Sequence, residues 1–177
     1  MSAKINFDTA NVEYFQIEES DLLDDDFESD IDEFTQYYHM ECLSDVRERI
    51  VHAYFIKVDG VNMGYVTLAM AHIRNNATEA IKSKEINGNV PALLISHIAV
   101  RKNNQRRGIG RALLDLVFVH LVPELTNRAG CRYVMLNPRD DQEVRDFYTN
   151  YGFEYYPNFV DDKESDACLY DLKINRN

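Results

Sequence analysis

The chain has 177 residues, of which 45% are hydrophobic, and a formal net charge of −11, so it can form one domain with a core of its own. Its first residues lack an apolar signal core and no apolar run reaches about 18 residues, which argues against a membrane partner and predicts a cytoplasmic protein. Three scattered cysteines argue against a disulfide framework, and no Cys/His spacing indicates a bound metal, so none is expected.

The charge is distributed unevenly along the chain. Residues 1–48 carry fifteen acidic and two basic residues, whereas residues 97–132 carry seven basic and two acidic residues. A locally basic centre suits an anionic ligand, while the acidic front argues against broad nucleic-acid binding, which needs clustered lysine and arginine. The acidic run at 24–33 could attract a cationic acceptor, but we prefer to interpret it as a solvated helix N-terminus.

The first third of the chain predicts one strand and one helix. Residues 12–17 suit a strand, and the acidic residues 1–30 are expected to be partly irregular. Apolar residues at helical spacing predict a helix from about Asp30 into the forties. Ser29 followed by Asp32 has the pattern of a capping box at the start of this helix.

A hairpin and a loop come next. Residues 50–58 are rich in β-branched and aromatic side chains, and the return strand runs from 61 to about 73. Asp59-Gly60 between them is a strong signal for a two-residue hairpin turn. Residues 75–91 are polar and predict a flexible loop.

The second half alternates strands and helices. The expected elements are a largely apolar strand at 92–100, a helix after Gly108 that ends near Pro123, a short strand at 133–136, a helix at 140–151 with Gly152 as its stop, and closing strands at 153–156 and 168–174. With no repeats and no linker, residues 1–177 are expected to be a single domain. The element order predicts an α/β fold, a mixed sheet with helices on its faces.

The stretch from Ile98 to Leu114 carries the strongest chemical signal. A strand runs into a basic loop with two glycines, and this loop opens an apolar helix. Free N–H groups at a helix start, glycines without a Cβ and clustered arginines together form a cradle for a pyrophosphate. The pattern Gln-x-x-Gly-x-Gly between strand and helix resembles the acetyl-coenzyme A (acetyl-CoA) motif of the GNAT family of N-acetyltransferases.

This resemblance implies a single-domain α/β fold with a mixed, mostly antiparallel central sheet flanked by helices. It implies that acetyl-CoA is the co-substrate, without a metal, and that the amine attacks directly in a ternary complex. In this family the loop N–H groups hold the pyrophosphate, and the preceding strand holds the pantetheine arm and stabilises the oxyanion. The cofactor-binding residues carried over are Ile98, Ala99, Val100, Arg101, Gln105, Arg106, Arg107, Gly108, Ile109, Gly110, Arg111, Asn137 and Tyr148.

Two residues are candidates for proton transfer. Tyr148 precedes Gly152-Phe153 by four residues, as does the family tyrosine that faces the coenzyme sulfur and serves as general acid. A packed helix aromatic is the alternative for Tyr148. His97 stands where many relatives carry a glutamate and could serve as general base, with a purely structural histidine as the alternative.

The front half resembles toxin-type acetyltransferases of bacterial toxin–antitoxin pairs, on the segments 27–34, 53–56 and 64–69. Known toxins of this kind acetylate the amino group of aminoacyl-tRNA. The acidic net charge instead favours a small-molecule or peptide amine as acceptor, with nucleic acid expected only as aminoacyl-tRNA in the alternative. A non-catalytic module that binds coenzyme A is the third interpretation. Homodimers are common in the family, but the sequence shows no interface, so a homodimer stays open.

Overall fold

The computed structural model describes residues 11–18, 26–74, 89–160 and 165–173. The loop predicted at 75–91 lies mostly outside these residues. Its last three residues are described, and they open a strand rather than a loop.

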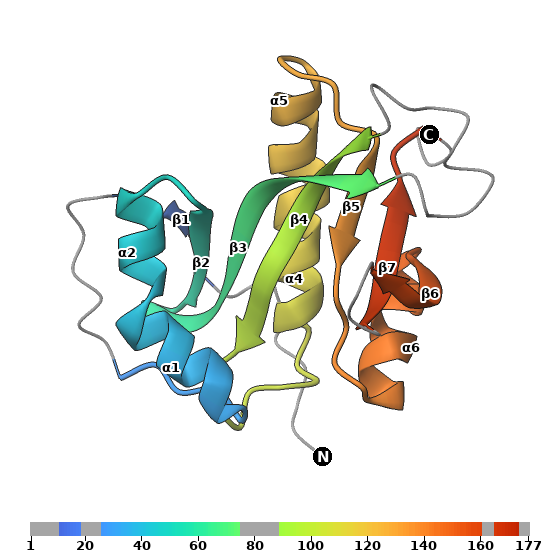
Figure 1. Ribbon diagram of the computed structural model, residues 1–177. Coiled ribbons are helices and arrows are strands. Elements are labelled where there is room, and N and C mark those ends of the chain that lie inside the picture. Colours follow the sequence, from blue (N-terminus) through green and yellow to red (C-terminus); the bar gives the residue numbers. More distant parts are fainter. Residues whose placement is uncertain (1–10, 19–25, 75–88, 161–164, 174–177) are drawn as a thin grey trace. The chain divides into compact units, whose positions relative to one another are not determined.

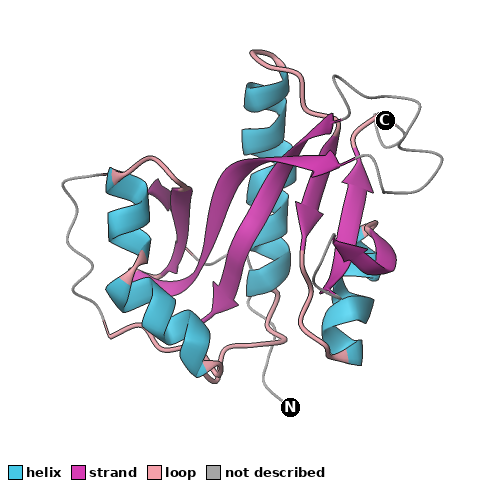
Figure 2. Ribbon diagram, viewed as in Figure 1, coloured by secondary structure: helices cyan, strands magenta, loops and turns pink. Residues whose placement is uncertain are grey.

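Figures 1 and 2 show the strands and helices of the chain. The strands are β1 (Val12–Gln16), β2 (His52–Val58), β3 (Val61–Arg74), β4 (Asn89–Val100), β5 (Tyr133–Leu136), β6 (Glu154–Val160) and β7 (Ser165–Asp171). The helices are α1 (Asp32–Met40), α2 (Cys42–Arg47), α4 (Ile109–Asp115), the π-helical segment η1 (Leu116–Leu121), α5 (Val122–Thr126) and α6 (Gln142–Tyr151). None of the helices in the described ranges is long and apolar enough to cross a membrane.

The hydrogen-bonded strand order is β1-β2-β3-β4-β5-β7-β6. Strands β4 and β5 pair in parallel, whereas β1 with β2, β2 with β3, β5 with β7, and β6 with β7 pair antiparallel. The β2–β3 hairpin turns at Asp59 and Gly60, which both have positive φ angles, as the predicted turn requires. The mixed, mostly antiparallel sheet flanked by helices is therefore confirmed.

The described residues fall into two compact units, and strands β3 and β4 contribute to both. The first unit lies within Met1–Ala69 and His97–Glu124, and the second within Met70–Ser96 and Leu125–Asn177. The predicted site residues from His97 to Arg111 consequently belong to the first unit, whereas Asn137 and Tyr148 belong to the second.

Within the first unit, β3 presents different side chains to its two faces because side chains alternate along a strand. The Tyr65 hydroxyl donates to the main-chain oxygen of Phe34 in α1 over 2.9 Å. Its neighbour Gly64 faces α4, since a Cβ there would lie 3.1 Å from Leu113 Cδ1. Helix α1 and helix α4 therefore cover opposite faces of β3.

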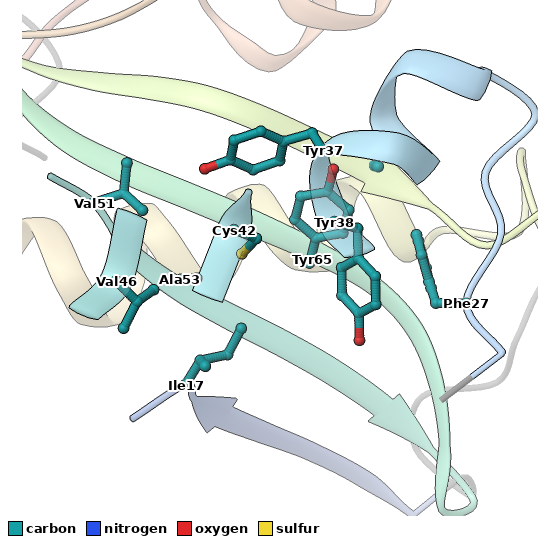
Figure 3. Close-up of a cluster of buried hydrophobic side chains, with 10 residues drawn as sticks. Ile17, Phe27, Tyr37, Tyr38, Cys42, Val46, Val51, Ala53 and Tyr65 are labelled. Carbon is teal, nitrogen blue, oxygen red and sulfur yellow. The ribbon is translucent and has the colours of Figure 1, made fainter. Parts of the chain in front are cut away.

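The core beneath α1 and α2 is rich in aromatic side chains (Figure 3). Phe27 is fully buried, with its ring centroid 4.8 Å from that of Tyr38 and 5.5 Å from that of Tyr65. Burying one such ring contributes roughly 1.5–3 kcal/mol to folding. The buried residues of this cluster are Ile17, Phe27, Tyr37, Tyr38, Cys42, Val46, Val51, Ala53, Tyr65 and Ala99.

The helix predicted from Asp30 is present, but Glu41 divides it into α1 and α2 because its φ of −122° is not helical. The predicted capping box is wrong. The N-cap residue is Ile31, which has no side-chain cap, while the Ser29 hydroxyl accepts from the Ile31 N–H over 3.3 Å. An isolated β-bridge to Arg101 holds Ser29 in an extended conformation too early in the chain to cap α1.

The helix after the glycines continues beyond Pro123 to the end of α5. The segment η1 precedes this proline, and the Val122 N–H donates to the Val117 oxygen in a widened turn. A proline ring collides with the carbonyl four residues earlier in a regular helix. The widened turn places Pro123 in the first turn of α5, where a proline is tolerated.

Candidate functional site

The basic loop that follows β4 is tied to the acidic segment before α1. The Arg101 guanidinium donates from Nε to the Asn62 oxygen over 2.6 Å and from Nη2 to Asp26 Oδ1 over 3.1 Å, and it lies over the Phe27 ring. The Lys102 N–H donates to the main-chain oxygen of Glu28 over 2.6 Å. The side chain of Arg101 is thus engaged by protein groups, and the described part of the acidic run anchors the loop.

The backbone of the loop turns sharply before α4. Asn103 and Arg106 have φ angles near +60°, and Gly108 has a φ of +100°. Gly108 is the N-cap residue of α4, has no side-chain cap, and its oxygen accepts the first helical bond from Ala112 N over 2.9 Å. The first N–H groups of a helix have no acceptor within it, and the helix dipole is positive at this end. This helix start can hold an anionic group.

Basic side chains surround the helix start. Arg106 and Arg111 are exposed, as is Gln105, while Arg107 is half-buried and donates to Asn104 Oδ1 over 2.6 Å. Arg111 also lies 3.9 Å from Asp115, one turn further along α4. The loop therefore combines backbone donors with positive charge, the chemistry that a pyrophosphate requires.

Strand β4 leads into this loop. Ala99 is buried, whereas Ile98 and Val100 are half-buried. The Ala99 oxygen would lie 2.6 Å from a Cβ at Gly64, so the backbones of β3 and β4 approach closely there. The role that the resemblance implies for these strand residues uses their main-chain groups, which are present whatever the side chain.

His97 on β4 is held by three neighbours. Its ring stacks on Tyr37 with centroids 3.6 Å apart and planes 13° apart, and it meets the edge of Phe34 at 6.1 Å. Its Nδ1 lies 3.3 Å from the Thr67 hydroxyl oxygen, which also accepts from the His97 main-chain N–H over 3.0 Å. Burial lowers the pKa of His97, against the opposing charges of Asp45 and Glu33. A neutral imidazole can accept a proton, as the predicted base requires.

Three residues that surround or support His97 carry no signal in the sequence. Tyr37, Asp45 and Thr67 come from α1, α2 and β3. The Tyr37 hydroxyl donates to Asp45 Oδ2 over 3.0 Å, and burial raises the pKa of Tyr37 well above its usual range. No sequence spacing links these residues, so only the packing of the helices on the strands could reveal them.

In the second unit, Tyr148 lies on α6. Asp141 caps this helix by accepting from the N–H groups of Glu143 and Val144, and Gly152 ends it with a φ of +118°. The Tyr148 ring is buried and lies edge-on to Phe153 at 5.7 Å. Its hydroxyl makes no hydrogen bond with any described residue. Burial raises the pKa of Tyr148 well above its usual range, so it stays protonated and can donate.

Asn137 directly follows β5 and is exposed. Its side-chain amide donates to the main-chain oxygen of Asp166 over 3.1 Å. This bond secures the start of β7 and leaves the Asn137 side-chain oxygen as an acceptor. Within the described ranges, no group of three or more His, Cys, Asp or Glu side chains is arranged to hold a metal.

Several solved structures of toxins have a fold similar to that of this chain. AtaT complexed with acetyl-methionyl-tRNAfMet is 18% identical, with a TM-score of 0.73, and the match covers 92% of this chain and 96% of that one. A tyrosine-to-phenylalanine mutant of AtaT, bound to the C-terminus of the antitoxin AtaR and acetyl-CoA, is 16% identical with a TM-score of 0.71, covering 93% and 95%.

A curated relative matches over part of the chain. A tRNA-acetylating toxin of Mycobacterium tuberculosis (strain ATCC 25618 / H37Rv) is 28% identical over 99 residues, which are 56% of this chain and 58% of the relative. The match thus spans little more than half of the relative's length.

These comparisons overturn one expectation from the sequence. A small-molecule or peptide amine was expected as partner, with nucleic acid disfavoured by the net charge, whereas the similar proteins include a toxin named for acetylating tRNA and toxins complexed with tRNA or an antitoxin. The expectation failed because net charge sums the whole chain, while a bound ligand responds to the local field of the surface that it meets.

A model of the acetyltransferase (GNAT) domain matches residues 51–155, which include β2 to β5, the basic loop and α6. The chain therefore belongs to the acetyltransferase (GNAT) family.

Proposed function

We propose that this protein is a toxin-type N-acetyltransferase that transfers an acetyl group from acetyl-CoA to the amino group of an aminoacyl-tRNA. The similarity to a tRNA-acetylating toxin carries this proposal, because that match is to a protein named for its substrate. The likeness to AtaT in complex with acetyl-methionyl-tRNAfMet, over nearly the full length of both chains, supports it. The reaction would take place in the cytoplasm, where charged tRNAs are found.

The basic loop and the start of α4 would hold the pyrophosphate of acetyl-CoA. The main-chain N–H groups from Gln105 to Gly110 are the proposed donors, with Arg106 and Arg111 as nearby positive charges. Arg101 has a different role here, because its guanidinium already binds Asn62 and Asp26 and so positions the loop. Main-chain groups of residues 98–100 would hold the pantetheine arm and the carbonyl oxygen.

Acetyl-CoA supplies the acetyl group as a thioester. The Tyr148 hydroxyl would hold the proton that the departing sulfur takes up, since burial keeps this group protonated. His97 would accept the proton that the amine loses, since burial keeps its imidazole neutral. A tyrosine-to-phenylalanine mutant of AtaT has a structure with acetyl-CoA bound, and a change of this kind is a suitable test at Tyr148.

The test is acetyl transfer from labelled acetyl-CoA to a pool of aminoacyl-tRNAs. The label should co-migrate with tRNA and be released by mild alkali as an N-acetyl amino acid, because alkali cleaves the ester to tRNA but not the new amide. Deacylated tRNA is the matched control and should remain unlabelled. Release of free coenzyme A without label on tRNA would contradict the proposal. Binding of acetyl-CoA without release of free coenzyme A in the presence of any acceptor would also contradict it. The second result would instead support a non-catalytic coenzyme A-binding module.

A further inference from the structure

We propose that Tyr37 and Thr67 fix the tautomer of His97 so that its Nε2 atom is the base for the acceptor amine. Asp45 holds Tyr37 in the position that this requires. This inference rests on the proposed transfer of an acetyl group to an amine. All four residues belong to the first unit and come from α1, α2, β3 and β4.

The hydroxyl of Thr67 belongs to a fully buried residue. A threonine hydroxyl has one proton to donate and two lone pairs that accept. The Tyr37 hydroxyl gives its own proton to Asp45 Oδ2 over 3.0 Å, so in its hydrogen bond with Thr67 it can only accept, and Thr67 is the donor. With its proton committed, Thr67 can only accept from its remaining neighbours.

Two nitrogen atoms of His97 occupy those lone pairs. The main-chain N–H lies 3.0 Å from Thr67 Oγ1, and the ring Nδ1 lies 3.3 Å from the same oxygen. Since Oγ1 only accepts here, Nδ1 must carry a proton. A neutral imidazole has one N–H, so the lone pair is then on Nε2. No described residue forms a hydrogen bond with Nε2.

Tyr37 is fixed from both sides. Its hydroxyl accepts from Thr67 and donates to Asp45 Oδ2 over 3.0 Å. Its ring lies against the His97 ring with centroids 3.6 Å apart, which fixes the plane of the imidazole. Hydrogen bonds therefore run in one direction from His97 Nδ1 to the Asp45 carboxylate. Asp45, Tyr37 and Thr67 act through His97 and are positioning residues.

The protons balance in this arrangement. The His97 Nε2 lone pair takes one proton from the acceptor ammonium, which yields the neutral amine and an imidazolium. The amine nitrogen then forms the bond to the acetyl carbon, and the bond from that carbon to the coenzyme sulfur breaks. The second proton that the amine loses leaves to solvent, and the departing thiolate takes up one proton and leaves as the free thiol. The Asp45 charge, transmitted through the hydrogen bonds, favours the imidazolium as it forms, as an orienting carboxylate does in other bases held by a third group.

The titratable groups that influence the Tyr37–His97 pair or lie beside it are Glu33, Asp45, Cys42 and Tyr65. Burial keeps Tyr37, Tyr65 and Cys42 protonated, with the pKa of Cys42 raised to about 12. The charges of Asp45 and Glu33 raise the pKa of His97, while burial lowers it by more. Removing the Asp45 charge should therefore move the acid limb of the activity profile to lower pH.

The first test needs no substrate. Nitrogen-15 NMR of the whole protein, above the pH at which His97 titrates, distinguishes a protonated ring nitrogen from one with a lone pair. We expect the Nδ1–H form in the wild-type protein and loss of that preference in Thr67→Val. A wild-type His97 with its proton on Nε2 would overturn the inference, whatever the fate of the proposed function.

The second test compares two adjacent tyrosines on α1. Tyr37→Phe keeps the ring stack but breaks the hydrogen bonds, and should lower kcat/KM for the acceptor about tenfold with acetyl-CoA binding unchanged. Tyr38→Phe is the matched control, because its buried hydroxyl instead accepts from Asn62 Nδ2 over 3.2 Å. Equal effects of Tyr37→Phe and Tyr38→Phe on kcat/KM would refute the role of these residues. So would a pH profile of activity whose acid limb is unchanged in both Asp45→Asn and His97→Gln.

Discussion

Replacing Gly64 with alanine tests how closely β3 packs against the start of α4. The new Cβ would lie 2.6 Å from the Ala99 oxygen, 3.1 Å from Leu113 Cδ1 and 3.3 Å from Ile109 Cγ2. Overpacking costs about 1–3 kcal/mol, and the upper half applies because the nearest atom is backbone and cannot rotate away. Alanine also lowers the conformational entropy of the unfolded chain, which stabilises the folded protein by about 0.4–1 kcal/mol. We therefore expect a net loss of about 1–2.5 kcal/mol.

The measurement is urea unfolding of Gly64→Ala beside Gly130→Ala. Gly130 has open space where its Cβ would be, so this control should be neutral or slightly stabilising. A loss of about 1–2.5 kcal/mol corresponds to a fall in Tm of about 2–10 °C for a chain of this size. A Gly64→Ala protein as stable as the Gly130→Ala control would refute the close approach of the β3 and β4 backbones.

Three further predictions concern the site and its supports. Tyr148→Phe should lower thiol release by about 10²-fold or more, while calorimetry finds acetyl-CoA binding nearly unchanged; unchanged turnover would remove Tyr148 from the mechanism. Gly108→Val places a β-branched side chain at a φ of +100°, so acetyl-CoA affinity should fall, and equal affinity would argue against the proposed cradle. Asp141→Ala removes the α6 cap and should cost about 0.5–2 kcal/mol in thermal unfolding; Asp146→Ala, inside the same helix, is its control.

Helix α6 illustrates what local sequence signals can predict. The apolar spacing and Gly152 predicted both the helix and its end, and the structure confirms them, with Gly152 at a φ of +118°. Such signals succeed because each acts within one or two turns of the backbone. The same holds for the hairpin turn at Asp59-Gly60, where two positive φ angles need residues that tolerate them.

The start of α1 illustrates the opposite case. Ser29 has the right type and spacing for a cap, yet a β-bridge to Arg101, far along the chain, holds it extended. The acidic run also has a contact that its composition did not indicate, because Asp26 accepts from the Arg101 guanidinium. Contacts between distant segments override local preference, and a single sequence carries no signal for them.

The sequence by itself determined the order of strands and helices, the glycine-containing basic loop and the family resemblance, because these depend on residues close together in the chain. The tertiary structure alone decided what surrounds His97. Tyr37 and Thr67 contact it, and Asp45 contacts Tyr37, only because two helices pack on two strands and bring these side chains within hydrogen-bonding distance. Proton transfer depends on such neighbours, so the chemistry of the histidine is a property of the fold.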